Sequence, residues 1–207
     1  MLNDVYMIIK RTIDLLLALL LLIIACVPIL VIAISIKLFD KGPAFFKQKR
    51  VGKDEKVFIC YKFRTMKTNA PHNISTKEFK DSYKYITPIG RFLRRSSLDE
   101  LPQLFNVLIG NMSLVGPRPL IKEERDIHEM RRKYGVYKHK PGITGLAQIC
   151  GRDMLSDVRK AECDAIYVEN ISFTVDAKIF LATMLRVINR EDIHVQTDQM
   201  LDNDLFK

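Results

Sequence analysis

Leu15 to Ile36 read LLLALLLLIIACVPILVIAISI, a long apolar run without a charged side chain. About 20 predominantly apolar residues are enough for a helix to cross the hydrocarbon core of a bilayer. The run is longer than the apolar region of an ordinary signal peptide, and no small-x-small cleavage site with a secreted-type domain follows it. The sequence therefore predicts a membrane-embedded helix near the N-terminus.

The flanks of this run and its proline bear on whether the helix crosses the membrane. Lys10 and Arg11 precede it, and five further cations follow it, namely Lys37, Lys41, Lys47, Lys49 and Arg50. Basic flanks favour the cytoplasmic side, so a simple crossing would place one of them outside. Pro28 removes a backbone donor near the middle of the run, which predicts a bend there.

We therefore predict a re-entrant helix that enters the membrane, breaks at Pro28 and returns to the side from which it came. The alternative is a single Pro-kinked transmembrane helix, which lipid tolerates when the freed backbone groups find partners. The residues alone leave both readings open.

Length and charge set the remaining organisation. The chain has 207 residues, which suits one ordinary domain with one core. Its 33 Lys and Arg outnumber 24 Asp and Glu, and the formal net charge of +9 favours anionic partners such as phosphates, lipid headgroups or nucleic acid. We divide the chain into a membrane anchor at residues 1–40, a cytosolic domain at 41–190 and an acidic peripheral tail at 191–207.

The cysteines and histidines exclude two classes of small stabilised domain. The four cysteines are Cys26, Cys60, Cys150 and Cys163, and none of them forms a C-x-x-C pair. The four histidines are His72, His128, His139 and His194, and no H-x-x-x-H pair occurs. This spacing fits neither a disulfide framework nor a zinc site, and it indicates reduced thiols in a cytosolic compartment.

Two strands are predicted directly after the membrane segment. Residues 44–51 and 57–63 are rich in strand-favouring side chains and are separated by Gly52-Lys53-Asp54-Glu55, which is typical of a turn. We expect a short β-hairpin. Alternate residues of a strand share a face, which places Lys62 and Arg64 side by side. Two adjacent cations could hold a phosphate, and the alternative is an ordinary solvated strand face.

Four later segments have the apolar spacing of amphipathic helices. They start at Leu101 and end near Gly110, run from Ile127 to Tyr134, and cover residues 155–169 and 174–189. The stripe from Ile127 to Tyr134 could lie on the membrane surface or face the core. The predicted fold class is α+β: the re-entrant membrane helix, a short β-hairpin and several amphipathic helices form a compact membrane-associated domain.

An acidic pair among cations marks the region that is best suited to catalysis. In Arg91 to Pro119, RFLRRSSLDELPQLFNVLIGNMSLVGPRP, Asp99 and Glu100 are adjacent. The cations around them are Arg91, Arg94, Arg95 and Arg118. One carboxylate can attack phosphorus as a nucleophile while the other helps to hold a divalent cation. Oxygen ligands favour Mg²⁺, which needs only one or two protein carboxylates because it keeps water and substrate phosphate in its shell.

A purely structural alternative exists for the same residues. Ser97-Leu98-Asp99-Glu100 matches the capping box S-x-x-E, in which the acidic residues stabilise the start of a helix. Pro102 argues against it, because a helix from Ser97 would lose one backbone hydrogen bond there. Capping and catalysis are also compatible, since a helix N-terminus attracts anions.

Two segments punctuated by glycine and proline, residues 114–119 and 140–145, predict rigid turns. The first presents Arg118, and the second is followed by Arg152. An arginine in each place is suited to bidentate contacts with phosphate. A structural turn would explain either segment alone.

Several motifs follow one another in a fixed order. They are Lys10-Arg11-x-x-Asp14, Gly42-Pro43, Gln48-x-Arg50-Val51-Gly52, Tyr61-Lys62-Phe63-Arg64-Thr65-Met66, Ser97-Leu98-Asp99-Glu100-Leu101-Pro102-Gln103, Gly116-Pro117-Arg118-Pro119 and Lys140-Pro141-Gly142-Ile143-Thr144-Gly145. On these motifs the chain resembles, over nearly its whole length, the bacterial sugar transferase family of monotopic polyprenyl-phosphate phosphoglycosyl transferases, in its small single-domain form.

The resemblance implies a two-step reaction. A UDP-sugar donates its phosphosugar to an aspartate and releases UMP, after which a polyprenyl (undecaprenyl) phosphate takes the group. The product, a polyprenyl-diphosphate-sugar, would begin a bacterial glycan pathway at the membrane. Asp99 is implied to be the nucleophile and Glu100 its Mg²⁺-associated partner, so both are expected near the metal. A re-entrant membrane helix is also implied.

Other expectations combine the resemblance with the charge of the chain. Because both substrates are anionic, we expect five cations to bind their phosphates: Lys62, Arg64, Arg94, Arg118 and Arg152. One departure concerns the membrane helix, because small members of the family often have Ser before the proline, whereas this chain has Val27 before Pro28. The bend then lacks a hydroxyl for the freed carbonyl.

The expected location is the bacterial inner (cytoplasmic) membrane, with the catalytic domain facing the cytoplasm. The expected partners are the UDP-sugar, the polyprenyl phosphate, membrane lipid and downstream glycosyltransferases, and no nucleic acid. Two alternatives remain. One, from a different class, is a membrane-tethered protein that binds anionic lipid or nucleic acid without catalysis. The other is a transferase that acts by a single direct displacement with the carboxylates only holding metal.

Overall fold

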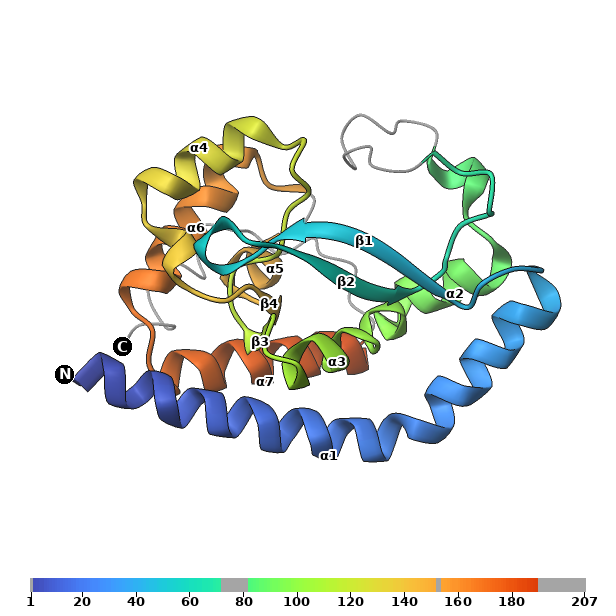
Figure 1. Ribbon diagram of the computed structural model, residues 1–207, viewed down its shortest axis with the longest axis horizontal. Coiled ribbons are helices and arrows are strands. Elements are labelled where there is room, and N and C mark those ends of the chain that lie inside the picture. Colours follow the sequence, from blue (N-terminus) through green and yellow to red (C-terminus); the bar gives the residue numbers. More distant parts are fainter. Residues whose placement is uncertain (1, 72–81, 152–153, 190–207) are drawn as a thin grey trace.

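The computed structural model describes residues 2–71, 82–151 and 154–189 (Figure 1). Arg152 and the tail predicted at 191–207 lie outside the described residues. The elements in order are α1 (Leu2–Phe39), β1 (Phe45–Val51), η1 (Lys53–Glu55), β2 (Val57–Phe63), η2 (Ser82–Tyr85), α2 (Pro88–Arg95), η3 (Leu98–Glu100), α3 (Gln103–Leu108), β3 (Ser113–Val115), α4 (Arg125–Lys133), η4 (Val136–Lys138), β4 (Gly142–Thr144), α5 (Leu146–Cys150), α6 (Asp157–Glu169) and α7 (Phe173–Asn189).

The apolar run forms one long helix, α1, that bends under the rest of the molecule (Figure 1). The helix is continuous across Pro28, so the break expected there is a bend in an unbroken helix. Within the described residues, Val5–Phe39 is the segment long and apolar enough to cross a membrane, and only 6% of its most apolar window is buried. A core helix of a soluble protein would be mostly buried, so something other than the described part of this chain must shield the apolar surface of α1 from water.

Both ends of α1 contact the same domain. Near the N-terminal end, Lys10 Nζ lies 2.6 Å from Asp176 Oδ2 of α7. Near the C-terminal end, Ile36 is fully buried and packs with Phe63 of β2 and Leu93 of α2. The helix therefore runs along one side of the domain and is attached to it at both ends.

The predicted hairpin is confirmed. Strands β1 and β2 pair antiparallel, with Phe45 opposite Phe63 and Val51 opposite Val57. One side-chain amide continues the sheet on the free edge of β2. Asn106 of α3, fully buried, accepts a hydrogen bond from Tyr61 N at 3.0 Å and donates one to Ile59 O at 2.6 Å. This amide fixes α3 against the strand that carries Lys62.

The two glycine-rich segments were predicted as separate turns, and they instead lie side by side. β3 and β4 form a short parallel pair, and beyond it Gly116 N donates to Thr144 O at 2.8 Å while Gly142 N donates to Pro117 O at 2.9 Å. A Cβ on Gly142 would lie 2.1 Å from Gly116 N, so only glycine allows this approach. The prediction missed the pairing because it joins residues far apart in the sequence.

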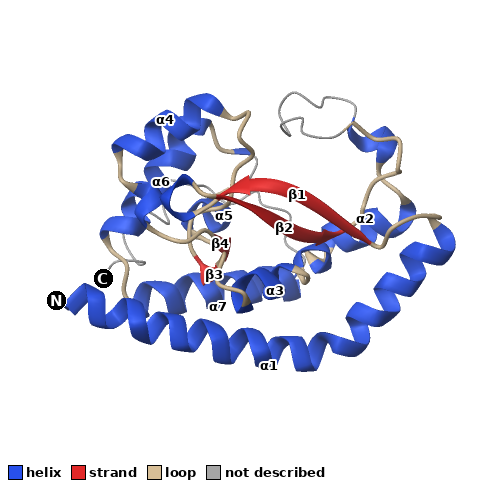
Figure 2. Cartoon of the chain, in the orientation of Figure 1, coloured by secondary structure: helices blue, strands red, loops and turns tan. Residues whose placement is uncertain are grey.

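The predicted amphipathic helices are present as α3, α4, α6 and α7, and helices lie at both ends of the β1–β2 hairpin and below it (Figure 2). The main core lies among α1, α3, α5, α6 and α7, with Val107, Tyr167 and Ile179 among its buried residues. In α4, Ile127 is 1% exposed and packs with Leu120 and Ala161. α4 lies on the side of the domain opposite α1 (Figure 1), and Ile127 and Met130 of the stripe pack into the core while Tyr134 is 46% exposed, which favours the core-facing alternative.

Candidate active site

The acidic pair lies in a single turn between two helices. Asp99 and Glu100 belong to η3, which follows α2 and precedes α3. Ser97 has a left-handed backbone (φ 55°), and its side chain makes no capping hydrogen bond. The capping-box alternative is therefore wrong: η3 is a short 3-10 turn, and α3 begins only after Pro102. Glu100 is consequently available for contacts with other parts of the chain.

Glu100 forms ion pairs with two cations from distant parts of the chain. Lys62 Nζ, on β2, lies 2.8 Å from Glu100 Oε1, and Arg118 Nη1 lies 3.2 Å from the same oxygen. The side chains of Lys62 and Glu100 are 18% and 16% exposed, and that of Arg118 is 37% exposed. Lys62 and Glu100 are therefore largely shielded from solvent, whereas Arg118 is the more exposed member of this ion-pair cluster.

Asp99 is held in a setting that opposes its charge. Burial raises the pKa of its carboxyl, and the neighbouring charge of Glu100 raises it further. The cations Lys62, Arg94 and Arg118 act in the opposite direction, but the net effect is a raised pKa. A half-buried carboxylate next to another carboxylate is a typical arrangement of catalytic acid groups.

Arg94 is brought to the site by close packing of α2. The helix starts with Thr87, whose hydroxyl accepts a hydrogen bond from Gly90 N at 3.0 Å. A Cβ on Gly90 would lie 2.0 Å from Thr65 O, so glycine lets α2 lie directly against the chain that leaves β2. Arg94 Nε then donates to Thr65 Oγ1 at 2.9 Å.

The loop that presents Arg118 is held by the buried Arg131 and the half-buried Arg50, which the sequence patterns did not assign to the site. Arg131 of α4 donates from Nη1 to Arg118 O at 2.9 Å and from Nε to Asp164 Oδ2 at 2.9 Å. Arg50 of β1 donates from Nη1 to Pro119 O at 3.0 Å. Burial lowers the pKa of Arg50, and the charge of Arg118 lowers it further, which places Arg50 close to the site.

A sequence motif contains Arg50, but no sequence pattern pointed to Arg131. Arg50 stands in the motif Gln48-x-Arg50, and Gln48 Oε1 accepts hydrogen bonds from its guanidinium. Arg131 stands in a highly charged segment, which is typical of a solvated surface. No local pattern distinguished Arg131, which is 2% exposed, from its exposed neighbours.

Arg64 does not join Lys62. The residue follows the last residue of β2, so the strand alternation that paired the two side chains ends before it. Arg64 is 6% exposed, and its Nη2 donates to Asp40 O at 3.3 Å, just beyond the end of α1. Its place as a phosphate ligand stays a prediction, as does that of Arg152, which lies outside the described residues.

The donor set around Asp99 and Glu100 fits a magnesium ion that is bound mainly through its substrate. Among the described residues no group of three or more His, Cys, Asp or Glu could form a full protein cage. Mg²⁺ does not need one, because one or two carboxylates together with substrate phosphate and water are sufficient. Two adjacent carboxylates supply only oxygen donors, the type that Mg²⁺ prefers.

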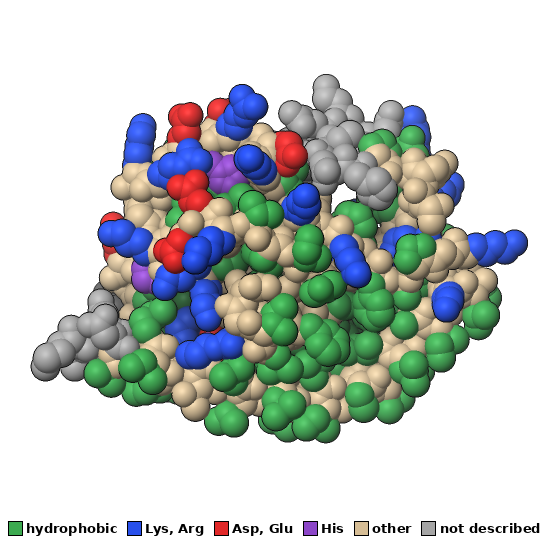
Figure 3. All heavy atoms as spheres, in the orientation of Figure 1, with side chains coloured by type: hydrophobic (Ala, Val, Ile, Leu, Met, Phe, Trp, Pro, Cys, Tyr) green, Lys and Arg blue, Asp and Glu red, His purple; other side chains and the backbone are tan. Residues whose placement is uncertain are grey.

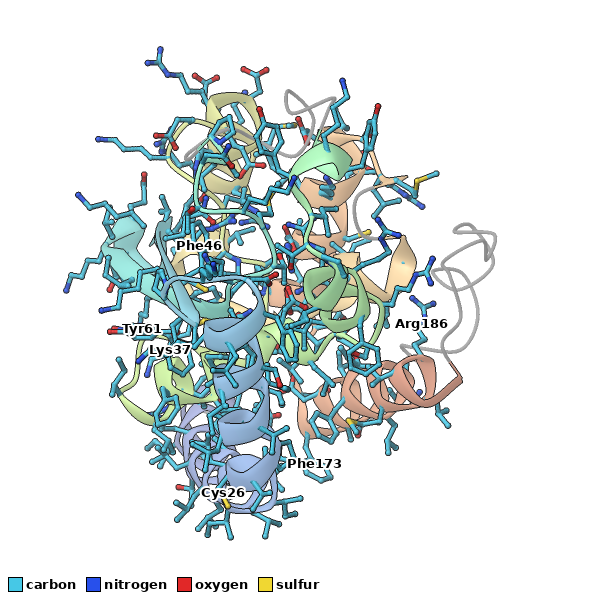
Figure 4. The ribbon with its side chains drawn as sticks, turned by 90° about the vertical axis from the view of Figure 1, so that its right-hand side faces the viewer. Cys26, Lys37, Phe46, Tyr61, Phe173 and Arg186 are labelled. Atoms are coloured by element: carbon cyan, nitrogen blue, oxygen red, sulfur yellow. The ribbon has the colours of Figure 1, made fainter. Side chains whose placement is uncertain are left out.

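The side of the molecule along α1 is apolar. Figure 3 shows hydrophobic side chains along its lower edge, and α1 contributes Ile8, Leu16 and Ile24 with exposed fractions of 71%, 63% and 66%. In Figure 4, Cys26 of α1 and Phe173 of α7 both lie toward the bottom of the molecule. Phe173 is 60% exposed, so α7 extends the apolar side that α1 begins.

Comparison with known proteins identifies relatives along the whole described region. The family model described as bacterial sugar transferase matches residues 5–190. A Bacillus subtilis protein named uncharacterized sugar transferase EpsL is 43% identical over 191 residues, which covers 90% of this chain and 91% of the relative.

Two similar proteins have named activities. The undecaprenyl-phosphate galactose phosphotransferase of Salmonella typhimurium is 39% identical over 196 residues, covering 88% of this chain. The UDP-glucose:undecaprenyl-phosphate glucose-1-phosphate transferase of Klebsiella pneumoniae is 40% identical over 192 residues, covering 89% of this chain. The chain spans 41% of the length of each of these two relatives.

Proposed function

The chain belongs to the bacterial sugar transferase family and is a phosphoglycosyl transferase, and from this premise we propose that it moves the phosphosugar of a UDP-sugar to a polyprenyl phosphate. The observation that carries the proposal is the position of Asp99, half-buried beside Glu100 and within the fields of Lys62, Arg94 and Arg118. A carboxylate surrounded by cations can attack a diphosphate whose charge those cations neutralise.

We infer two displacements at one phosphorus atom. In the first, a carboxylate oxygen of Asp99 bonds to the sugar-bearing phosphorus, the bond from that phosphorus to the bridging oxygen breaks, and UMP leaves. In the second, a phosphate oxygen of the polyprenyl phosphate attacks the same phosphorus and the bond to Asp99 breaks. The product is a polyprenyl-diphosphate-sugar, and Asp99 is restored.

The cations of this chain would act by position. Lys62 and Arg118 hold Glu100 Oε1 and can turn toward a substrate phosphate that enters between them. The backbone contacts from Arg131 and Arg50 keep the Arg118 loop in place. Mg²⁺ held by Asp99 and Glu100 would supply further neutralisation of phosphate charge when bound.

We also propose that α1 is re-entrant rather than membrane-spanning. Lys10 and Ile36 lie near opposite ends of the apolar run, yet both are packed into the same domain. A straight span would place these two ends on opposite sides of the bilayer, about 30 Å apart across its hydrocarbon core. Attachment of both ends to one domain supports a helix that dips into one leaflet.

The cellular location follows from the substrates. A long-chain polyprenyl phosphate stays in the bilayer, whereas a UDP-sugar is soluble, so their phosphates meet at the interface. We propose the bacterial inner membrane with the domain on the cytoplasmic side, where the basic flanks of α1 are favoured. Downstream glycosyltransferases would consume the product.

Intact-mass spectrometry of the purified full chain tests the proposal. After incubation with the correct member of a panel of UDP-sugars, the wild-type protein should gain the mass of one phosphosugar and release UMP. Asp99→Asn should do neither. Asp126→Asn, which removes an exposed carboxylate of α4, should behave as wild type.

The single-displacement alternative predicts a different result. A direct transfer would release UMP only when a polyprenyl phosphate is present, and labelled UMP would not exchange into the donor without it. A competent preparation that turns over without the adduct and without this exchange would overturn the covalent step.

A further inference from the structure

A second charged site lies beside the N-terminal part of α1. A cavity of about 370 Å³, open to solvent on one side, is lined by α1, the hairpin turn at Lys53, the residues around Ser113 and the segment 138–140. None of Asp99, Glu100, Lys62, Arg94 or Arg118 lines it. Figure 3 shows Lys and Arg side chains around a hollow above this part of α1. The volume lies within the range of about 300–1,000 Å³ that is usual for small-molecule sites.

The inner wall of this cavity is fixed by hydrogen bonds. Lys10 Nζ donates to Val115 O at 3.0 Å and also pairs with Asp176. Arg11 donates to Val107 O at 2.8 Å. This inner wall is therefore a preformed feature of the fold, whereas Lys53 and Lys138 line the cavity as exposed side chains.

Asp14, a carboxylate of the lining, is already occupied. It accepts hydrogen bonds from Ser113 Oγ at 2.7 Å and from Leu114 N at 3.1 Å. Three of the lysines that line the cavity have no carboxylate partner among the described residues. Within the described ranges, the structure pairs none of Lys53, Lys138 and Lys140 with a carboxylate.

Several cations converge on the same space. A Cβ built on Gly110 would lie 3.5 Å from Arg11 Nη2 and 3.8 Å from Lys140 Nζ, so these two groups flank one glycine. Burial lowers the pKa of Lys140, and the charges of Arg11 and Lys53 lower it further. The repulsion among these cations is a cost that a bound anion would relieve.

The pKa of His139 is lowered by burial and by the same excess of positive charge. Burial lowers the pKa of its imidazole, and the charges of Lys53, Lys10 and Lys138 lower it further. Its Nδ1 is shielded from solvent and has no hydrogen-bond partner among the described residues. The cavity thus combines excess positive charge with an unused polar atom.

We propose that this cavity binds the phosphate of an acidic phospholipid headgroup. Met7, Ile8 and Ile171 line the same cavity, and Ile8 is 71% exposed on the apolar side of α1. A headgroup could place its phosphate among the cations while its glycerol and acyl chains leave over these apolar side chains. A soluble phosphate would make no use of them.

The inference rests on the membrane embedding of α1 in the proposed function but not on the transfer reaction. A lipid bound here would hold the N-terminal end of the helix at the membrane–water interface, at a distance from the acidic pair. The site would therefore orient the domain on the bilayer.

Native mass spectrometry of the full chain in detergent, with dioleoylphosphatidylglycerol or the zwitterionic dioleoylphosphatidylcholine titrated in, tests this site. The wild-type protein should bind the first phosphatidylglycerol at least about tenfold more tightly than phosphatidylcholine. Lys138→Gln/Lys140→Gln should lose at least about tenfold of that affinity. Lys122→Gln/Lys133→Gln, which removes two exposed lysines next to or within α4, should bind as wild type.

Equal phosphatidylglycerol binding by both double variants and wild type would overturn the proposal. Inorganic phosphate, added without lipid at matched ionic strength, separates the two sources of phosphate: if it binds and phosphatidylglycerol does not displace it, the site is for a soluble anion.

UMP release measured on the same preparations keeps the two proposals apart. Loss of lipid binding in Lys138→Gln/Lys140→Gln with UMP release retained supports the cavity as a separate site, whereas wild-type protein that binds lipid but forms no adduct contradicts only the transferase mechanism.

Discussion

The ammonium group of Lys62 lies 2.8 Å from Glu100 Oε1, and this contact joins the hairpin to the turn that carries the acidic pair. Arg118 reaches the same oxygen from the segment after β3. One carboxylate oxygen is thus the meeting point of three parts of the chain. Its environment depends on how well each of them is held, which makes the surrounding contacts testable.

Lys62→Met should lower the rate of UMP release by about 10²-fold, the usual effect of removing one preorganised charge-stabilising donor. Glu100 would keep Arg118 but lose the cation that β2 supplies. Lys47→Met is the matched control, because Lys47 is an exposed residue of β1 opposite Tyr61. Steady-state assays should separate the two variants clearly, and equal activity would contradict the role of Lys62.

Asp99→Asn should abolish transfer while making the folded protein more stable near neutral pH. Burial and Glu100 raise the folded-state pKa of Asp99 above its ordinary value of 3.8, so ionising it costs stability. Where the pH lies between the unfolded and folded pKa values, the folded state holds more protons and stability falls as pH rises. The gain from Asp99→Asn should therefore be absent below about pH 4 and grow as the pH increases.

Thermal unfolding of both proteins across this pH range measures the effect. Asp126→Asn, on the exposed face of α4, should give no such pH-dependent difference. A stability loss in Asp99→Asn at neutral pH would mean that the ionised carboxylate is stabilised rather than opposed by its surroundings.

Asn106→Ala should destabilise the protein by about 1–3 kcal/mol, because it leaves the partly buried Tyr61 N and Ile59 O without their partners. It should also reduce activity, since α3 and the turn before it would lose their fixed position on β2. Asn170→Ala is the control: its side chain donates to Ile166 O but is exposed. An unfolding temperature of Asn106→Ala equal to that of the control would show that the amide is not needed.

Lys10→Met should cost about 3–5 kcal/mol, the usual penalty for leaving one member of a buried ion pair alone. Asp176 would keep hydrogen bonds from Tyr6 and Tyr167 but no cation within contact. Lys37→Met, an exposed position near the other end of α1, should change the unfolding temperature little. Similar temperatures for both variants would remove the anchoring role of the pair.

A re-entrant α1 predicts that both of its flanks lie on the cytoplasmic side. In a Cys26→Ala background, Asn3→Cys and Lys41→Cys should each resist a membrane-impermeant thiol reagent applied to intact cells and react after permeabilisation. The three remaining native cysteines are buried, so their labelling should be low. Reaction of either engineered cysteine from outside would establish a membrane-spanning helix instead.

The sequence by itself determined the parts of this protein that local patterns encode. The apolar run requires a cover, the strand alternation and the turn at Gly52 specify the hairpin, and the apolar spacing from Leu101 specifies α3. The adjacency of Asp99 and Glu100 is covalent, so the acidic pair is recognisable in the sequence without knowledge of how the chain folds.

Only the tertiary structure decided which cations reach that pair. Lys62 and Arg64 are two residues apart, yet one contacts Glu100 and the other the end of α1, because β2 ends between them. The same holds for the buried Arg131 and for the pairing of β3 with β4, which join segments distant in sequence. Such contacts depend on how whole elements pack in three dimensions, and the spacing of residues along one segment carries no record of that packing.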